Sequence, residues 1–118
     1  MWTIYHNQNC SKSNAALNLL TENNADYQII NYLDTPLSIE ELTNICALLD
    51  NNIESMMRKK DEAFAAIRHA WEHADLTAKI KLLSDNISLL ERPIVVNPHN
   101  KAKIGRPDHT ALLELFEE

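Results

Sequence analysis

The most chemically reactive side chain in this sequence is that of Cys10, which lies in the polar stretch NQNCSKS at residues 7–13. A strand-like segment precedes this stretch and an apolar-periodic segment follows it, so Cys10 is expected where a strand ends and a helix begins. Unpaired N–H groups and the positive end of the helix dipole lower the pKa of a thiol at that position. His6 and Lys12 can add positive charge, and Ser13 can donate a hydrogen bond. Because the flanking residues are all polar, we interpret Cys10 as a reactive cysteine.

The spacing around Cys10 excludes several chemistries. Ser13 creates a Cys-x-x-Ser arrangement, so the resolving thiol must come from Cys46 or from another molecule. Position 16 is Ala16, where the phosphatase-type Cys-x5-Arg motif requires arginine. With no second cysteine close by and no paired histidine motif, we expect no metal site and no bound cofactor. Cys46 lies on the apolar face of a predicted helix and is expected in the core.

Length and composition set the class of protein. A chain of 118 residues with 45% hydrophobic and 24% charged residues is typical of one soluble globular domain. A net charge of −6 argues against a nucleic-acid partner. No stretch has the roughly 20 apolar residues of a membrane span, and the N-terminus does not resemble an export signal. We therefore expect a cytoplasmic protein with reduced cysteines. A single glycine leaves no Gly-rich phosphate loop.

The elements that must position Cys10 can be predicted from the first third of the chain. Residues 2–6 and 27–32 have the β-branched and aromatic content of strands. A helix with a broad apolar face is predicted from Ser11 to about residue 22. Strand, helix and strand in so few residues indicate a right-handed unit with two parallel strands.

The rest of the chain is first helical and then returns to strands. Ser38 and Glu41 form a capping-box pattern, and helical periodicity continues to about residue 83. Residues 92–97 and 102–105, joined by turn-forming residues, predict a β-hairpin, and Asp108 can cap a final helix. This order predicts an α/β thioredoxin-like fold: one domain over 1–118, with 38–90 as a mainly helical insertion.

Four separate blocks resemble a known family. They are IYHNQNCSKS (4–13), MMRKKDEAF (56–64), LERPIVV (90–96) and AKIGRP (102–107). In this order and spacing the chain resembles, from about Thr3 to Leu115, the ArsC family of glutaredoxin-coupled arsenate reductases. Within that family it is most similar to the YfgD-like branch with a Cys-Ser-Lys-Ser motif.

The resemblance implies a role for each matching residue. Cys10 corresponds to the family's nucleophile, and Arg58, Arg92 and Arg106 to its three oxyanion-binding arginines. His6 corresponds to the histidine that helps activate the thiol, Ser13 to the serine at the helix start, and Pro93 to the cis-proline that faces the cysteine. Guanidinium groups bind tetrahedral oxyanions bidentately and stay charged at any relevant pH, which agrees with these roles.

The resemblance also implies an activity. The thiolate attacks arsenate, glutathione acts as co-substrate, and glutaredoxin completes the reduction to arsenite in a monomeric enzyme. Two features depart from the family: Gln8 replaces the usual proline, and an Ala-rich segment over residues 64–76 replaces a Gly-rich or Leu-Gly-Leu one.

Two other functions remain open from the residues alone. Spx-type regulators share the predicted fold and bind RNA polymerase, but they typically carry a Cys-x-x-Cys switch that Ser13 removes here. A glutathione-dependent monothiol oxidoreductase without arsenate specificity would also need a reactive Cys10. It would not need Arg92 and Arg106.

Overall fold

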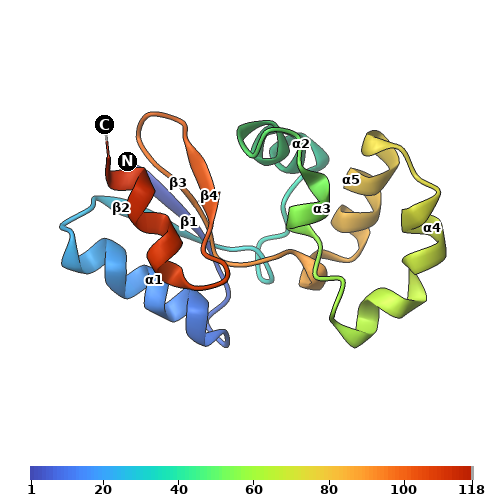
Figure 1. Cartoon of the computed structure of the whole chain (residues 1–118), viewed down its shortest axis with the longest axis horizontal. Helices are drawn as coiled ribbons and strands as arrows, with labels where there is room; N and C mark the ends of the chain where they lie inside the picture. Colours follow the sequence, from blue (N-terminus) through green and yellow to red (C-terminus); the bar gives the residue numbers. More distant parts are fainter. Residues whose placement is uncertain (118) are drawn as a thin grey trace. The chain divides into compact units, whose positions relative to one another are not determined.

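A four-stranded sheet organises the part of the protein that carries Cys10. The structure is a computed structural model, and it describes residues 1–117. Contacts between residues divide the chain into two compact units, one formed by residues 1–35 and the segment from Arg92 onward, the other by Pro36–Glu91 (Figure 1). We call them the sheet unit and the helical unit. The assignment of 38–90 as an insertion into a single domain stays a prediction.

The sheet unit contains the predicted pair of parallel strands and the predicted β-hairpin. Its strands β1 (Trp2–His6), β2 (Tyr27–Asn31), β3 (Ile94–Val96) and β4 (Ala102–Ile104) lie in the order β2-β1-β3-β4. The β1 and β2 strands are parallel, whereas β3 is antiparallel to both β1 and β4. The parallel unit around helix α1 (Ser11–Glu22) and the C-terminal hairpin are therefore confirmed, and so is the α/β thioredoxin-like fold.

Two helices cover one face of this sheet (Figure 1). Ile4 of β1 lies opposite Val95 of β3, and both side chains are fully buried. They belong to a core with Ala16 and Leu20 of α1 and with Leu112 and Leu115 of the C-terminal helix η3 (His109–Phe116). Packing on this core fixes the direction in which α1 leaves the sheet, and with it the position of Cys10 at its start.

The predicted final helix is present, and the structure shows its type, which the prediction did not specify. Asp108 caps it as expected, accepting a hydrogen bond from the Thr110 N–H at 2.8 Å. The helix itself is a 3-10 helix rather than an α-helix. Its two buried leucines, Leu112 and Leu115, are three residues apart, and three residues per turn place both on the face that meets the sheet.

The helical unit consists of six short helices. They are α2 (Ile39–Leu48), α3 (Ile53–Met56), η1 (Glu62–Ala66), α4 (Arg68–Glu72), α5 (Leu76–Asp85) and η2 (Ile87–Leu89). The capping box at α2 is confirmed, because Ser38 Oγ accepts from the Glu41 N–H at 3.0 Å and Glu41 Oε1 accepts from the Ser38 N–H at 3.2 Å. The continuous helical pattern through Phe64 and Trp71 is divided at Ile67 between η1, whose N-terminus Asp61 caps, and α4.

An isolated antiparallel bridge pairs Met57 with Leu90 and joins two distant segments of the helical unit. The Arg58 N–H donates to the Leu89 carbonyl at 2.9 Å, and the Glu91 N–H donates to the Met56 carbonyl at 2.8 Å. This pairing lays Arg58 and Glu91 side by side. Among the residues that the structure describes, no helix is long and apolar enough to cross a membrane.

Candidate active site

Cys10 occupies the boundary between loop and helix that its sequence context predicted. It is the N-cap residue of α1, with φ of −107° and ψ of 121°, and its side chain makes no capping hydrogen bond. Its N–H donates to the Asn7 carbonyl at 3.0 Å, and its carbonyl accepts from the Asn14 N–H at 3.0 Å. These backbone bonds hold a partly exposed thiol at the N-terminal end of the helix.

The surroundings of Cys10 lower the pKa of its thiol. Burial alone would raise that pKa, but it is outweighed by the Ser13 N–H, by a hydrogen bond and the charge of the Arg92 guanidinium, and by the Lys12 N–H. Each of these groups stabilises the thiolate and not the neutral thiol. Cys10 is thus a better nucleophile near neutral pH than an ordinary cysteine.

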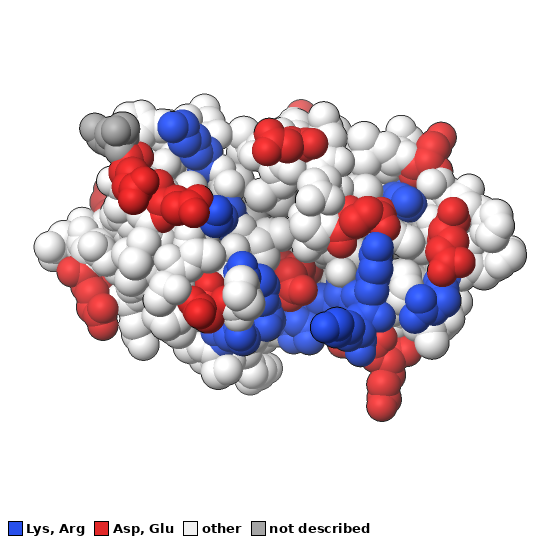
Figure 2. Space-filling view, viewed as in Figure 1, with Lys and Arg blue, Asp and Glu red and all other residues white. Residues whose placement is uncertain are grey.

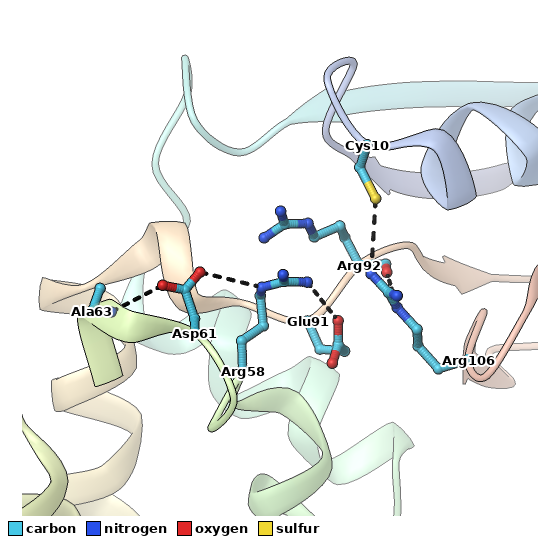
Figure 3. A network of polar contacts seen from close by, with 7 residues as sticks. All are labelled: Cys10, Arg58, Asp61, Ala63, Glu91, Arg92 and Arg106. Carbon is cyan, nitrogen blue, oxygen red and sulfur yellow. Dashed lines mark hydrogen bonds and ion pairs between the residues drawn. The ribbon is translucent and has the colours of Figure 1, made fainter. Parts of the chain in front are cut away.

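Arg106 approaches the same sulfur from the end of β4. Its Nη2 donates to Cys10 Sγ at 3.8 Å, and its Nε donates to the Arg92 carbonyl at 2.9 Å (Figure 3). Of the two arginines, it is Arg92 that lowers the Cys10 pKa, together with the Ser13 and Lys12 N–H groups, and not this long Arg106 contact. Two of the three predicted arginines therefore lie with Cys10 in the sheet unit.

The backbone beside these arginines is closely packed. The Gly105 N–H donates to the Pro93 carbonyl at 2.9 Å. A Cβ atom at Gly105 would lie 2.7 Å from Pro93 Cγ and 3.3 Å from Leu112 Cδ1, closer than such atoms normally approach. The Arg92–Pro93 peptide bond is cis, as the resemblance implied, and the Arg106–Pro107 bond is cis as well.

His6 and Ser13 form a buried polar pair beneath the loop that precedes Cys10. His6 Nδ1 and Ser13 Oγ are 2.6 Å apart, and the Asn7 N–H donates to the same hydroxyl at 3.1 Å. Burial lowers the pKa of His6, so its ring is neutral at pH 7. The positive charge that the sequence allowed for His6 is therefore a wrong expectation. Its visible role is to hold Ser13, whose N–H acts on Cys10.

Lys12 also contributes differently from the expectation. Its ammonium group donates to the Pro107 carbonyl, so the side chain joins the start of α1 to the segment after β4. The group of Lys12 that lowers the Cys10 pKa is its backbone N–H.

Arg58 lies in the helical unit, where two carboxylates hold its guanidinium. Nη1 is 3.1 Å from Glu91 Oε1, and Nε is 3.7 Å from Asp61 Oδ2 (Figure 3). Its participation with Cys10 stays a prediction from the resemblance. Neither carboxylate was predicted as a partner of Arg58, although Asp61 is three residues after Arg58 and Glu91 directly precedes Arg92.

The second cysteine has the opposite environment. Cys46 is 1% exposed on α2, and burial raises the pKa of its thiol. The prediction that Cys46 is a core residue is confirmed. A buried neutral thiol is a poor candidate for resolving an intermediate formed at Cys10.

Comparisons with known proteins agree with one another. The model of the ArsC family matches residues 5–112. The chain is 42% identical over 113 residues to an arsenate reductase of Haemophilus influenzae, covering 92% of this chain and 94% of the relative. It is 39% identical over 110 residues to the uncharacterized protein YfgD of Escherichia coli K12, covering 92% of each. A solved structure, the arsenate reductase from Vibrio cholerae, aligns with a TM-score of 0.87 at 36% identity over 96% of this chain and 95% of that one.

Proposed function

This chain belongs to the ArsC family, and on that premise we propose that it is an arsenate reductase whose nucleophile is the Cys10 thiolate. The observation that carries the proposal is the environment of the sulfur. The Ser13 N–H, Arg92 and the Lys12 N–H lower its pKa, and Arg106 donates to it at 3.8 Å. Relatives that are 40% and 42% identical to this chain, including the one from Haemophilus influenzae, are named arsenate reductases.

In the first step the enzyme binds arsenate beside Cys10. Arg92 and Arg106 supply planar donor groups that suit a tetrahedral oxyanion, and they supply positive charge in a chain with a net charge of −6. Arg58 is the third arginine of the set by its match to the family. The same charges that bind the anion also favour the thiolate, so binding and activation of the nucleophile depend on shared groups.

In the second step the Cys10 sulfur attacks arsenic. A sulfur–arsenic bond forms and one arsenic–oxygen bond breaks, and the departing oxygen leaves as water after protonation. Arsenic stays in the +5 state, so no electrons have yet been transferred. Arginine N–H groups near the departing oxygen stabilise the negative charge that develops there.

The two electrons come from external thiols. Glutathione displaces a second oxygen as water and forms a sulfur–arsenic bond. The glutaredoxin thiol then attacks the glutathione sulfur, and the electron pair of that bond stays on arsenic, which becomes +3. Water releases arsenite from Cys10 and regenerates its thiol, leaving a mixed disulfide of glutaredoxin and glutathione. Ser13 and the buried Cys46 favour this external route over an internal disulfide.

A coupled assay tests the proposal. Purified protein is mixed with arsenate, glutathione, glutaredoxin, glutathione reductase and NADPH, and both NADPH oxidation and arsenite are measured. We expect arsenite only when the protein, arsenate, glutathione and glutaredoxin are all present, and NADPH oxidation only when glutathione reductase is present as well. Absence of arsenite in the complete mixture would overturn the arsenate reductase proposal. An undiminished rate without glutaredoxin would overturn only the coupling.

A second substrate separates this function from that of a general monothiol oxidoreductase. A mixed disulfide of glutathione with a small thiol is offered in place of arsenate. We expect slow turnover that changes little in Arg106→Ala, whereas arsenate reduction falls strongly in the same variant. The opposite pattern would assign the arginines no role in anion binding.

A further inference from the structure

The helical unit contains a cavity that has no part in the chemistry of Cys10. Its volume is about 310 Å³, and it lies among α3, η1, α4 and α5. Volumes of this size are at the lower end of the range for small-molecule sites. The lining residues all belong to the helical unit: Glu54, Lys59, Phe64, Arg68, Trp71, Glu72 and Lys79.

Glu54 is the fixed polar centre of this cavity. Its Oε1 accepts from Lys59 Nζ at 2.5 Å and from Trp71 Nε1 at 3.1 Å, and its Oε2 is 3.0 Å from Lys79 Nζ. Burial alone would raise the pKa of Glu54, but hydrogen bonds from Lys59, Trp71 and Lys79 lower it to about 2. Glu54 is therefore an anion at physiological pH with both oxygens already occupied.

Arg68 differs from the other charged groups at the cavity. Its guanidinium lies 5.0 Å from the centre of the Phe64 ring, a cation–π arrangement that orients it. Its nearest carboxylate oxygen, Glu72 Oε1, is 3.9 Å away, beyond hydrogen-bond distance. Within residues 1–117 the Arg68 guanidinium makes no hydrogen bond, so an oriented set of donors is open to a ligand.

The charges at the cavity favour an anion. Three cations, Lys59, Arg68 and Lys79, meet two carboxylates, and both lysines already pair with Glu54, so Arg68 is the cation left to bind an anion directly. Figure 2 shows Lys and Arg side chains gathered on the helical unit with acidic side chains among them. Phe64 and Trp71 also line the cavity beside these charges, and because each residue is 1% exposed, they present a small apolar area to it. A ligand that matches all of these groups has an acidic end and an organic body.

We propose that this cavity binds a small organic carboxylate. The carboxylate accepts two parallel hydrogen bonds from Arg68, with Lys59 adding charge, and the organic body lies against Phe64 and Trp71. A hydroxyl or ammonium group next to the carboxylate donates to Glu72. The ligand class is thus a hydroxy- or amino-carboxylate. Four of the lining residues lie in the Ala-rich segment 64–76, by which this chain departs from its family pattern: Phe64, Arg68, Trp71 and Glu72.

Trp71 makes the proposal directly measurable. The only other tryptophan, Trp2, stacks on Phe116 with ring centres 4.3 Å apart, so Trp2→Phe retains an aromatic ring there and leaves Trp71 as the single tryptophan. L-malate and L-glutamate are titrated into this variant at constant ionic strength, and Trp71 emission is recorded. We expect a saturating change with either probe and a weaker response to acetate, which lacks the second polar group.

Variants in the Trp2→Phe background assign the response to Arg68. Arg68→Ala is expected to weaken binding about tenfold, the usual effect of losing a charge-assisted hydrogen bond. Arg68→Lys keeps the charge but loses the planar pair of donors, and it is expected to fall in between. Lys81→Ala is the matched control, because Lys81 lies on α5 but pairs with Asp85 away from the cavity. Circular dichroism checks that each variant is folded.

Three outcomes would overturn the proposal. The first is a response that rises linearly and is reproduced by sodium chloride. The second is an unchanged dissociation constant in folded Arg68→Ala. The third is equally tight binding of inorganic phosphate, which would make the cavity a simple anion site. None of these readouts depends on arsenate reduction.

Discussion

The N-termini of α1 and α2 differ in how their backbone N–H groups are used. At α2, Ser38 and Glu41 satisfy two backbone N–H groups reciprocally, so the end of the helix is closed by its own side chains. At α1, the N-cap residue is Cys10, which forms no such bond as a thiol. The N–H groups of Lys12 and Ser13 act instead on the sulfur and lower its pKa. A helix start that the N-cap side chain does not close is therefore what lowers the pKa of the cysteine here.

The two cysteines extend the comparison. Cys10 and Cys46 are the same residue type in helices of similar length, yet their pKa values move in opposite directions. Burial raises both, and only Cys10 has donors and an arginine that outweigh it. The direction in which the pKa of each thiol moves therefore depends on whether hydrogen-bond donors and positive charge lie beside it.

The largest expected effect separates the two thiols by activity. Cys10→Ser should abolish arsenate reduction, since a serine hydroxyl is a poor nucleophile at neutral pH, while Cys46→Ser should retain most of it. The coupled assay measures both variants against wild type. Full activity in Cys10→Ser, or a loss in Cys46→Ser that thermal unfolding does not explain, would break the comparison.

A smaller effect separates the two arginines. Thiolate reacts with iodoacetamide and thiol does not, so the rate of alkylation against pH reports the pKa of Cys10. Because Arg92 lowers that pKa, Arg92→Ala should move the alkylation midpoint to higher pH. Arg106→Ala should move it less, since its contact with the sulfur is long. Arg68→Ala is the matched control, and Cys46→Ser as background removes the other thiol.

The smallest effect concerns stability. Ser38→Ala should lower the free energy of unfolding by about 1 kcal/mol, the usual cost of losing an N-cap. Cys10→Ala should change it little at acid pH, where the thiol is protonated. A folded-state pKa below the ordinary value adds stability as pH rises from that folded pKa toward about 9, so the cost of Cys10→Ala should grow over that range. Urea unfolding at two pH values checks this, and a cost independent of pH would contradict it.

Most of the fold could be predicted because its signals are local. The pattern in residues 2–31 predicts strand, helix and strand, and the capping box at Ser38 marks the start of α2. The type of η3 could not be predicted, since Leu112 and Leu115 fit an α-helix and a 3-10 helix equally well. The division of the pattern at Ile67 into η1 and α4 could not be predicted either, because no capping side chain marks the start of α4.

The grouping of Cys10 with two of the predicted arginines could be predicted, but the contacts of these residues could not. Cys10, Arg92 and Arg106 lie together in the sheet unit, although 96 positions separate the first and last of them. The neutral state of His6 follows from burial by the surrounding fold, which no pattern near His6 reveals. The ion pair of Arg58 with Glu91 follows from the antiparallel bridge between Met57 and Leu90, a pairing of distant segments.

The missing side chain at Gly105 has a consequence for selectivity. Arg92 directly precedes Pro93 and Arg106 directly follows Gly105, and two backbone-anchored hydrogen bonds of 2.9 Å tie these segments together. The main chain therefore holds together the two segments from which the Arg92 and Arg106 side chains extend. Under the proposed function, the distance between these segments would limit the size of the oxyanion that both arginines can bind. A side chain at residue 105 would displace Pro93 and so change that distance.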